Sequence, residues 1–206
     1  TGKEWVARQI HTFGKRSEAP FVAVDCGALP RELAASELFG HKKGAFTGAT
    51  EDKTGMFATA NHGTLFLDEV GNLNMETQVL LLRALQEKRY RPVGGKEEMQ
   101  ADIRLLAATN EELEQTISEG RFREDLFHRL NEFPLHVPLL KNCEEDIIPL
   151  AGFFLSFANE ELEKNIKGFD RDVRKAFKTY SWPGNIRELK SVVRRACVLA
   201  QDDWIS

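Results

Sequence analysis

The stretch that decides the fold covers residues 63–70 and reads Gly63-Thr64-Leu65-Phe66-Leu67-Asp68-Glu69-Val70. Its apolar middle predicts a buried strand, and the carboxyl end of that strand delivers two adjacent carboxylates. Burying acidic groups at the end of a strand is costly unless a cation or another partner compensates their charge. Asp68 and Glu69 therefore indicate either a cation-binding site or the acidic start of a helix that follows the strand.

Similar apolar runs recur on both sides of this strand and alternate with helical patterns. Residues 21–24, 103–108 and 135–137 are predicted to form further strands. Alternation of this kind is typical of an α/β fold with a parallel sheet flanked by helices. Residues 90–100 contain a proline and paired glycines and indicate a turn-rich loop. The helices expected are residues 3–14, with Val6, Ile10 and Phe13 inward, and residues 76–86, with Val79, Leu82 and Leu85 inward.

Downstream of the last predicted strand the pattern is helical throughout. We expect one helix over residues 144–158 and another over residues 170–180, capped by Asp170. Asn185, followed three residues later by Glu188, predicts a capping box for the last helix. The chain is therefore expected to contain an α/β domain over residues 1–140 and a small all-helical domain over residues 141–206.

The composition excludes several classes of protein. The 206 residues carry a formal net charge of -4, with 42% hydrophobic and 29% charged side chains. A bulk nucleic-acid binder would normally be basic, so this balance argues against direct nucleic-acid binding. No apolar run is long enough to span a bilayer, and no signal-peptide pattern begins at Thr1. The spacing of the three cysteines and five histidines predicts a reducing, cytoplasmic location and no transition-metal site.

A second informative stretch is the hexapeptide Gly44-Ala45-Phe46-Thr47-Gly48-Ala49, called here the 44–49 loop. Glycines on both sides of its tip let the backbone turn back on itself, which would carry Phe46 and Thr47 outward on a mobile loop. An apolar ring held out on such a tip suits contact with another molecule. The alternative is an ordinary turn whose phenylalanine is buried in the core.

The 44–49 loop follows Ser36-Glu37-Leu38-Phe39-Gly40-His41-Lys42-Lys43 and precedes the strand that ends in Asp68-Glu69. Together these motifs resemble the AAA+ ATPase domain of bacterial enhancer-binding proteins, the NtrC-like activators of sigma-54 RNA polymerase. The resemblance implies a P-loop, RecA-like sheet followed by a helical lid, ATP hydrolysis with Mg²⁺, and a homo-oligomeric, hexameric ring. It also implies that the 44–49 loop contacts the sigma factor, and that nucleotide state moves this loop to remodel the closed promoter complex.

The resemblance assigns the nucleotide site to residues of several segments. Gly2 and Lys3 precede a helix, where loop amides and the helix N-terminus favour an anionic phosphate. Most phosphate-binding loops have Ser or Thr at the position of Glu4, where the hydroxyl binds Mg²⁺. The enhancer-binding family has Glu at this position, as this sequence does. Asp68 would hold Mg²⁺ through water, and Glu69 would be the general base that polarises the attacking water.

Two further residues match family positions near this site. Asn110 corresponds to sensor I, an amide that reaches the γ-phosphate or the attacking water, and it is equally suited to cap the next helix. Asp25 stands at the switch position, which in the family contacts the catalytic glutamate, here Glu69. Because an ionised aspartate cannot donate a hydrogen bond, that contact would need a shared proton, a bridging water or a separate state.

Arginines complete the predicted set. Arg123 and Arg129 lie in a segment that is dense in charge and framed by apolar residues, a pattern that alone indicates a solvated helix face. The resemblance makes both of them arginine fingers that reach the nucleotide of the neighbouring subunit, a task that suits the forked, permanently charged guanidinium. Arg187 corresponds to sensor II in the lid, and its alternative partner is Glu188 or another carboxylate of the lid.

Thr1-Gly2-Lys3-Glu4 resembles the last part of a phosphate-binding loop, so the chain is expected to be an excised domain. We therefore expect the fragment itself to bind and hydrolyse ATP poorly, and any DNA contact to belong to a separate domain. Two other functions are compatible with such a nucleotide site. A remodeller of another target, such as a protease-linked unfoldase, would not require the 44–49 loop. A non-catalytic binding module is disfavoured by the presence of Asp68, Glu69, Arg123 and Arg129.

Overall fold

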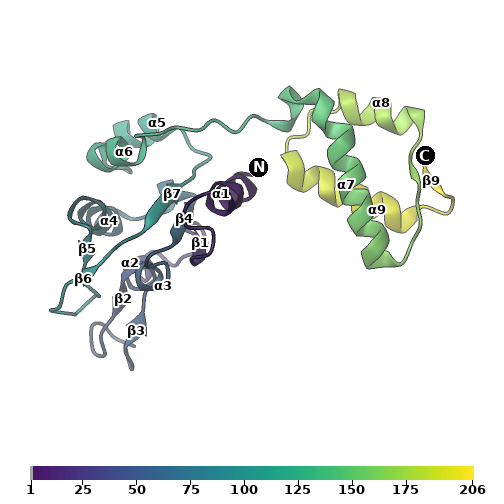
Figure 1. Cartoon of the computed structure of the whole chain (residues 1–206). Coiled ribbons are helices and arrows are strands. Elements are labelled where there is room, and N and C mark those ends of the chain that lie inside the picture. Colours follow the sequence, from purple (N-terminus) through teal and green to yellow (C-terminus); the bar gives the residue numbers. More distant parts are fainter. Residues whose placement is uncertain (1) are drawn as a thin grey trace. The chain divides into compact units, whose positions relative to one another are not determined.

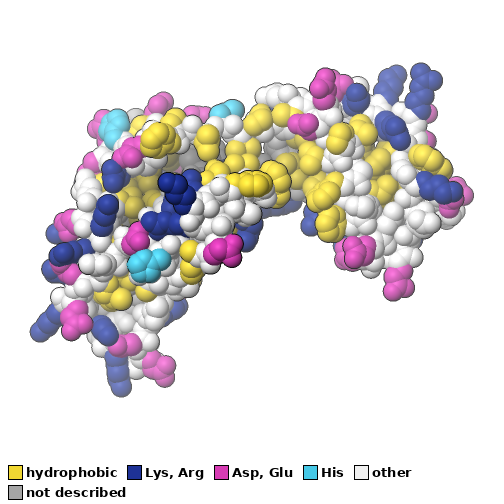
Figure 2. Space-filling model, viewed as in Figure 1, with side chains coloured by type: hydrophobic (Ala, Val, Ile, Leu, Met, Phe, Trp, Pro, Cys, Tyr) yellow, Lys and Arg dark blue, Asp and Glu magenta, His cyan; other side chains and the backbone are white. Residues whose placement is uncertain are grey.

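The computed structural model describes residues 2–206, which fold as two compact units. The first unit spans Lys3–Leu135, and the second consists mainly of His136–Ser206. Figure 1 labels the helices and strands of both. Figure 2 shows basic and acidic side chains interspersed over the visible surface, with no continuous basic stripe on that face.

The first unit is built around a parallel sheet of order β1-β4-β7. The central strand β4 (Thr64–Asp68) lies between β1 (Phe21–Asp25) and β7 (Arg104–Ala107) (Figure 1). The register places Asp25 beside Asp68, so β1 and β4 end at the same edge. The side chains of β4 from Thr64 to Leu67 are all buried, and a strand covered on both faces needs such an apolar run. The predicted α/β fold with a parallel sheet is confirmed.

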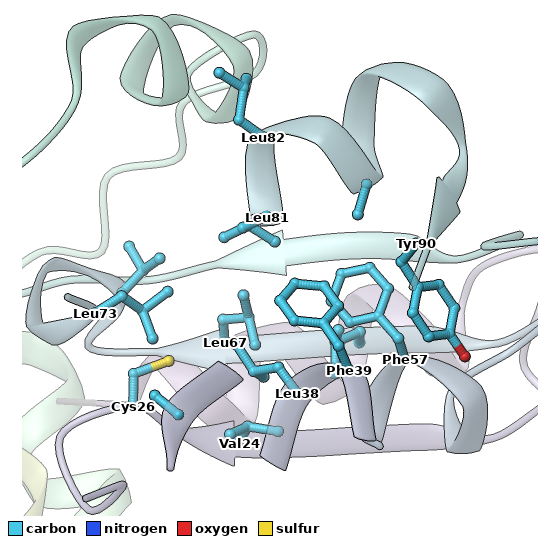
Figure 3. Close-up of a cluster of buried hydrophobic side chains, with 14 of the residues drawn as sticks. Val24, Cys26, Leu38, Phe39, Phe57, Leu67, Leu73, Leu81, Leu82 and Tyr90 are labelled. Atoms are coloured by element: carbon cyan, nitrogen blue, oxygen red, sulfur yellow. The ribbon is translucent and has the colours of Figure 1, made fainter. Parts of the chain in front are cut away.

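Helices flank this sheet and share its hydrophobic core. Figure 3 shows side chains from β1, β4, α2 and α4 meeting there, among them Val24, Leu38, Leu67 and Leu81. Burying a side chain of this size stabilises the fold by about 1.5–3 kcal/mol. The helical elements of the unit are α1 (Lys3–Thr12), α2 (Ala34–Phe39), α3 (Met56–Thr59), the 3-10 turn η1 (Val70–Asn72), α4 (Met75–Glu87), α5 (Leu113–Ser118) and α6 (Glu124–Leu130).

The buried face of α1 differs from the predicted one. Its buried residues are Ala7 and His11, whereas Phe13 lies beyond the end of the helix and is 85% exposed. His11 is tolerated in the interior because its Nδ1 lies 2.9 Å from the hydroxyl of Thr64. The prediction that Phe13 faces inward was therefore wrong, and a hydrogen-bonded histidine is buried instead.

The buried face of α4 is also shifted. Leu82 is buried as predicted, and Leu85 is partly buried. Val79, predicted to face inward, is exposed, while its neighbour Gln78 is fully buried. The prediction for Val79 was wrong because Gln78 has hydrogen-bond partners inside the fold, as described below.

Residues 135–137, predicted to form a strand, belong to no sheet in the part of the chain that the structure describes. Pro134 and Pro138 flank this run, and proline lacks the N–H that a ladder hydrogen bond requires. Leu135 is 71% exposed, so its side chain is not packed either. The prediction was wrong because a short apolar run between prolines meets the hydrophobic pattern without having a partner strand.

Two connected hairpins, formed by the strand pairs β2–β3 and β5–β6, project from the first unit (Figure 1). In the first, β2 (Gly40–His41) pairs antiparallel with β3 (Lys53–Thr54) and encloses the 44–49 loop. In the second, β5 (Arg89–Tyr90) pairs antiparallel with β6 (Met99–Gln100) and encloses the predicted turn-rich segment. Val93 joins the hairpins, because its carbonyl accepts from the N–H of Lys42 at 3.0 Å and its N–H donates to the carbonyl of Gly40 at 2.8 Å.

The second unit is mostly helical. Its short strands β8 (Gly168–Phe169) and β9 (Trp204–Ile205) form a parallel pair, so the prediction that it lacks strands was wrong. Strands of two residues are too short for an alternating pattern to reveal them. No helix within residues 2–206 has the length and apolarity needed to cross a membrane. The helical elements are η2 (Leu140–Asn142), α7 (Glu144–Leu162), α8 (Arg171–Thr179) and α9 (Asn185–Leu199).

Helix caps in the second unit agree in part with the sequence. The Asp170 cap is confirmed, because its carboxylate accepts from the N–H of Val173 at 2.8 Å. The capping box predicted between Asn185 and Glu188 does not form, because the cap of α9 is Gly184, one residue earlier. Glu188 accepts from the N–H of the cap residue Gly184 at 2.8 Å, but Asn185 does not cap the helix. Its side-chain oxygen instead accepts from the N–H of Leu140 at 2.9 Å.

Candidate nucleotide site and partner-contact loop

Several predicted site residues lie where the parallel strands end. β4 ends at Asp68, and Glu69 follows with φ 53° and ψ 46°, a left-handed conformation. Such a backbone at a residue other than glycine costs of order 1–3 kcal/mol and is concentrated at functional sites. The turn at Glu69 therefore marks this edge of the sheet as a candidate site.

Glu69 connects the start of α1 to the segment that follows β7. The Nζ atom of Lys3 lies 3.4 Å from Oε1 of Glu69, and the N–H of Asn110 donates to Oε2 at 3.1 Å. The Lys3 and Glu69 side chains are largely shielded, with exposed fractions of 14% and 23%. Asn110 does not cap the next helix, since α5 begins after Glu112. Three predicted site residues from separate segments thus converge.

The carboxyl groups of Asp68 and Glu69 at this edge of the sheet are partly buried, and nearby positive charge only partly offsets this effect on Asp68. Burial raises the pKa of the Asp68 carboxyl above its ordinary value of 3.8; Lys3 opposes this shift, while Glu69 and Asp25 add to it. The neighbouring thiol of Cys26 responds in the same way, because burial first, and then these carboxylates, raise its pKa to about 12. Cys26 is therefore a neutral, buried thiol and not a nucleophile.

These observations fit a site for Mg²⁺ and phosphate. The pKa of Asp68 is raised mainly because burial disfavours its ionised form, and a bound cation would favour that form. Mg²⁺ usually keeps several waters and takes one or two carboxylates from the protein, which suits the single aspartate at the end of β4. Within residues 2–206 no cluster of three His, Cys, Asp or Glu side chains could form a metal cage made only of protein ligands.

Two other predicted site residues use their side chains locally. Oδ1 of Asp25 accepts from the N–H of Gly27 at 2.9 Å, so this side chain closes its own turn and does not bond to Glu69. Glu4 pairs with Arg8 one helical turn away at 2.8 Å, and both side chains are 54% exposed. Neither side chain is bonded to Asp68 or Glu69, although the charge of Asp25 contributes to the raised pKa of Asp68. Gly2, just before α1, has φ 87°, a conformation that glycine adopts without penalty.

The two predicted arginine fingers each hold a carboxylate of the first unit. The guanidinium of Arg123 donates to both oxygens of Asp125, at 3.0 and 2.6 Å. Arg129 pairs with Glu132 and also donates to the carbonyl of Leu85 at 3.3 Å. The two arginine side chains remain 34% and 41% exposed. Both guanidiniums therefore lie at the surface, where another anion could replace the carboxylates.

A buried amide positions the Arg123 segment, and sequence reasoning missed it. The Nε2 of Gln78 donates to the carbonyls of Leu73 and Arg121 at 2.7 and 2.9 Å, and its Oε1 accepts from the N–H of Arg123 at 2.9 Å. A buried amide would cost several kcal/mol without such partners, on the order of 1–3 per group. The available signal was a polar residue on the face of α4 that also carries Leu81 and Leu82.

Arg187 lies in the second unit, in the first turn of α9, and is exposed. Glu188 was its alternative partner, but the Glu188 carboxylate accepts from the hydroxyl of Tyr180 at 3.0 Å and from the N–H of Gly184. Within residues 2–206, Arg187 forms no ion pair with a lid carboxylate. Its guanidinium is therefore available to an anion from elsewhere.

The 44–49 loop is closed by its own backbone. The N–H of Gly44 donates to the carbonyl of Ala49 at 2.8 Å. Gly44 and Gly48 have φ of 81° and 99°, and a Cβ at either would meet no atom within 4 Å, so backbone conformation, not space, requires glycine. Thr47 is exposed, whereas Phe46 is half-buried with its ring against His41 at a centroid distance of 4.9 Å. Phe46 is thus neither fully outward nor part of the core.

Models of two protein families match different parts of the chain. Residues 1–136 match the model of the sigma-54 interaction domain, and residues 141–206 match that of the AAA+ ATPase lid domain. The chain belongs to the sigma-54 interaction domain family. Members of this family are AAA+ ATPases, so the predicted resemblance to NtrC-like activators is confirmed.

Similar proteins are transcriptional regulators. The chain is 49% identical over 206 residues to the DNA-binding transcriptional regulator NtrC of Rhizobium meliloti, covering 42% of that protein. It is 50% identical over 205 residues to the response regulator protein PilR of Pseudomonas aeruginosa, covering 46%. It is 48% identical over 206 residues to the transcriptional regulatory protein ZraR of Escherichia coli, covering 47%. All of the chain is matched each time, but it spans less than half of these relatives.

Solved structures support the AAA+ fold of this sigma-54 interaction domain. The crystal structure of NtrX from Brucella abortus in complex with ADP has a TM-score of 0.92 and 36% identity, and the match covers 100% of this chain and 46% of that one. The complex of NtrX with ATP gives the same TM-score and identity, covering 100% and 45%. The AAA+ fold with a lid is therefore confirmed.

Proposed function

We propose that this sigma-54 interaction domain hydrolyses ATP to ADP and phosphate and uses the reaction to remodel the closed promoter complex of sigma-54 RNA polymerase. The observation that carries the proposal is the convergence of Lys3, Glu69 and Asn110 beside Asp68. In open α/β sheets, ligands bind outside the carboxyl ends of the strands, which is where these residues lie. The complexes of the similar protein NtrX with ADP and ATP support nucleotide binding.

The residues of the site would divide the chemistry between them. Lys3, at the start of α1, would hold the outer phosphates together with the backbone at Gly2. When the Lys3 ammonium moves to phosphate, Oε1 of Glu69 becomes free to accept a proton from the attacking water. The N–H of Asn110 keeps the other Glu69 oxygen in place during this step. Mg²⁺, held through water by Asp68, would neutralise charge on the phosphate oxygens.

Hydrolysis would require assembly into a homo-oligomeric ring, a hexamer by analogy with the family. Arg123 and Arg129 would exchange Asp125 and Glu132 for phosphate oxygens of the neighbouring subunit. Arg187 would read the nucleotide from the lid as sensor II, a role supported by its exposure and by the absence of an ion pair within the described residues. Glu4 and Asp25, which have local partners, would act only after rearrangement.

The 44–49 loop would contact the sigma factor. Its exposed Thr47 and half-buried Phe46 support this role, and neither is bonded to a residue of the nucleotide site. The relatives named as transcriptional regulators support a cytoplasmic location. Any DNA contact would come from another domain, in agreement with the interspersed charges of Figure 2 and the net charge of -4.

Substitutions in the 44–49 loop test the sigma-factor contact. In the full-length protein, Thr47→Ala and Phe46→Ala should abolish binding to sigma-54 in the presence of an ADP–metal-fluoride analogue, and with it open-complex formation. Truncating an aromatic anchor of a small interface often costs roughly 2 kcal/mol or more. A large loss of melting temperature in Phe46→Ala, or normal promoter opening by Thr47→Ala, would remove the loop from the mechanism. Normal promoter opening by Thr47→Ala is the result expected of an ATPase that acts on another target.

A substitution of the general base tests the chemistry. Glu69→Ala should still bind ATP, because Lys3 and Asp68 remain, but should hydrolyse it on the order of 10²–10⁴-fold more slowly. Glu114→Ala, which removes an exposed glutamate from α5, is the matched control and should hydrolyse ATP at the wild-type rate. Phosphate release is the measurement. A wild-type rate in Glu69→Ala, or no phosphate release by the full-length protein itself, would contradict the proposal.

A further inference from the structure

A chain of side-chain contacts runs from the core of the first unit to the 44–49 loop. Ser36 of α2 is 4% exposed, and its Oγ lies 2.6 Å from Nδ1 of His41. The ring of His41 in turn meets the ring of Phe46 edge to face, with centroids 4.9 Å apart and planes at 65°. This is a favourable geometry for an aromatic pair. The orientation of Phe46 is therefore linked, through His41, to a buried hydroxyl.

His41 is also fixed through its backbone. It lies in β2, pairs with Lys53 of β3 and bridges to Val93 of the second hairpin. Two hairpins thus hold its backbone, and Ser36 holds its ring nitrogen. The His41 ring is thus held through its backbone and through its Nδ1 where it meets the ring of Phe46.

The backbone of the 44–49 loop is held at its tip by a hydrogen bond from the N–H of Ala49 to the carbonyl of Phe46 at 3.0 Å, which does not involve the Phe46 ring. Gly44 and Gly48 stand in open space, and Thr47 is exposed. The second hairpin contacts the loop at its base, where a Cβ built on Gly94 would lie 2.7 Å from Cβ of Ala45. The second hairpin therefore approaches the loop at Ala45. The aromatic contact of Phe46 within the described residues is with the ring of His41.

We propose that His41 is a positioning residue that orients Phe46 for contact with the sigma factor, and that Ser36 holds the His41 ring in place. The inference rests on the proposed function of the 44–49 loop and assigns to two residues outside that loop the task of presenting it. His41 touches neither nucleotide nor, in this role, the sigma factor itself. It acts through Phe46.

The first experiment needs no partner protein. In the 206-residue chain labelled with ¹³C in its histidine rings, Phe46→Leu should shift the His41 ring resonances, because the ring current of Phe46 is lost. Ser36→Ala should shift the same resonances by removing the 2.6 Å contact. His62, which is exposed beside Asp102, is the internal control and should not move in either variant. An unchanged His41 spectrum in Phe46→Leu would overturn the inference.

The second experiment measures the affinity of the full-length protein for sigma-54 with an ADP–metal-fluoride analogue. His41→Ala should weaken binding by about 2- to 12-fold, the range that corresponds to the loss of one edge-to-face aromatic pair. His41→Phe and Ser36→Ala both keep a ring at position 41 but lose the contact with Ser36, so they should weaken binding by a similar, smaller factor. Ser118→Ala removes an exposed hydroxyl that donates to the carbonyl of Gln115, and it should bind like the wild type.

A double substitution separates positioning from a general structural effect. In a Phe46→Leu background, His41→Ala should cause no further loss of affinity, since the ring on which His41 acts is already absent. Equal losses in both backgrounds would overturn the inference. If His41→Ala melts below the assay temperature, His41→Phe is used for the same comparison.

The outcomes also separate this inference from the function on which it rests. Wild-type affinity of Phe46→Ala for sigma-54 would overturn the proposed function of the 44–49 loop. Lost binding by Phe46→Ala together with wild-type affinity of His41→Ala would overturn only the positioning role of His41.

Discussion

At the scale of the residue, Asp68 and Asp102 show how surroundings set the contribution of a carboxylate to stability. Burial raises the pKa of Asp68 above 3.8, so the folded state holds its proton more tightly than the unfolded state does. The pKa of Asp102 is lowered, first by its hydrogen bond from Arg16 and then by the one from His62. The folded state therefore favours the ionised form of Asp102. The two residues should affect the pH dependence of stability with opposite signs.

Asparagine substitutions test these signs. The stability from Asp68 falls as pH rises from about 3.8 through its folded pKa, so the melting temperature of Asp68→Asn relative to wild type should rise over that window. The stability from Asp102 is present above about 3.8 and is lost as pH falls through its folded pKa. The deficit of Asp102→Asn should therefore shrink on acidification. Melting curves between acidic and neutral pH measure both, and slopes of equal sign would contradict the argument.

At the scale of the element, a lysine from one helix end satisfies the carbonyls at the end of another helix. The last carbonyls of α9 have no partners within the helix, as in any α-helix. Lys164, which follows α7, donates from its ammonium to the carbonyls of Cys197, Val198 and Ala200 at 2.8, 2.8 and 3.0 Å. A positive charge at a helix C-terminus is also favoured by the helix dipole. Lys164 thus ties α7 to the end of α9.

Removing this ammonium should loosen the end of α9. Lys164→Met keeps much of the aliphatic chain and should lower the local free energy of opening by about 1–3 kcal/mol, because charge-assisted hydrogen bonds to the carbonyls are lost. Hydrogen exchange of the amides in the last turn of α9 is the measurement. Lys175→Met, which removes an exposed lysine from α8, is the control and should leave this exchange unchanged. Equal protection in the two variants would show that Lys164 does not cap the helix.

At the scale of the whole molecule, the proposed mechanism depends on a second copy of the chain. Within the first unit, Lys3 is the cation that contacts Glu69, while Arg123 and Arg129 are paired with Asp125 and Glu132. Phosphoryl transfer commonly needs a guanidinium at the developing charge. The proposed ring would supply it from the neighbouring subunit.

Mixed rings test this arrangement. In the full-length protein, Arg129→Ala should lower the rate of ATP hydrolysis on the order of 10³–10⁵-fold, as Arg123→Ala should, while ATP affinity stays near normal. Mixing Arg129→Ala with Glu69→Ala subunits should restore part of the activity, because at equal ratio about a quarter of the interfaces pair an intact Arg129 with an intact Glu69. Phosphate release across mixing ratios is the readout. No recovery, once mass spectrometry has shown mixed rings, would exclude action in trans.

Sequence-based predictions were correct where a feature depends on residues that are neighbours in the chain. The strand around Leu65–Leu67, its acidic end and the Asp170 cap were predicted because each is written in consecutive or nearly consecutive residues. The sequence did not predict the burial of Gln78 or the contact of Asn185 with Leu140. It wrongly predicted a strand at residues 135–137. In each of these, the outcome depends on whether a partner distant in the chain is present.

The sequence by itself determined the α/β class, the acidic end of the central strand and the glycine-bracketed loop. Apolar runs, adjacent carboxylates and left-handed glycines act on their immediate neighbours, so they can be read without coordinates. Only the tertiary structure decided that Lys3 and Asn110 meet at Glu69, and that Phe46 rests on His41. These contacts join segments that are brought together by the register of parallel strands and the pairing of two hairpins, and no local pattern encodes which distant side chain will satisfy a given charge or ring.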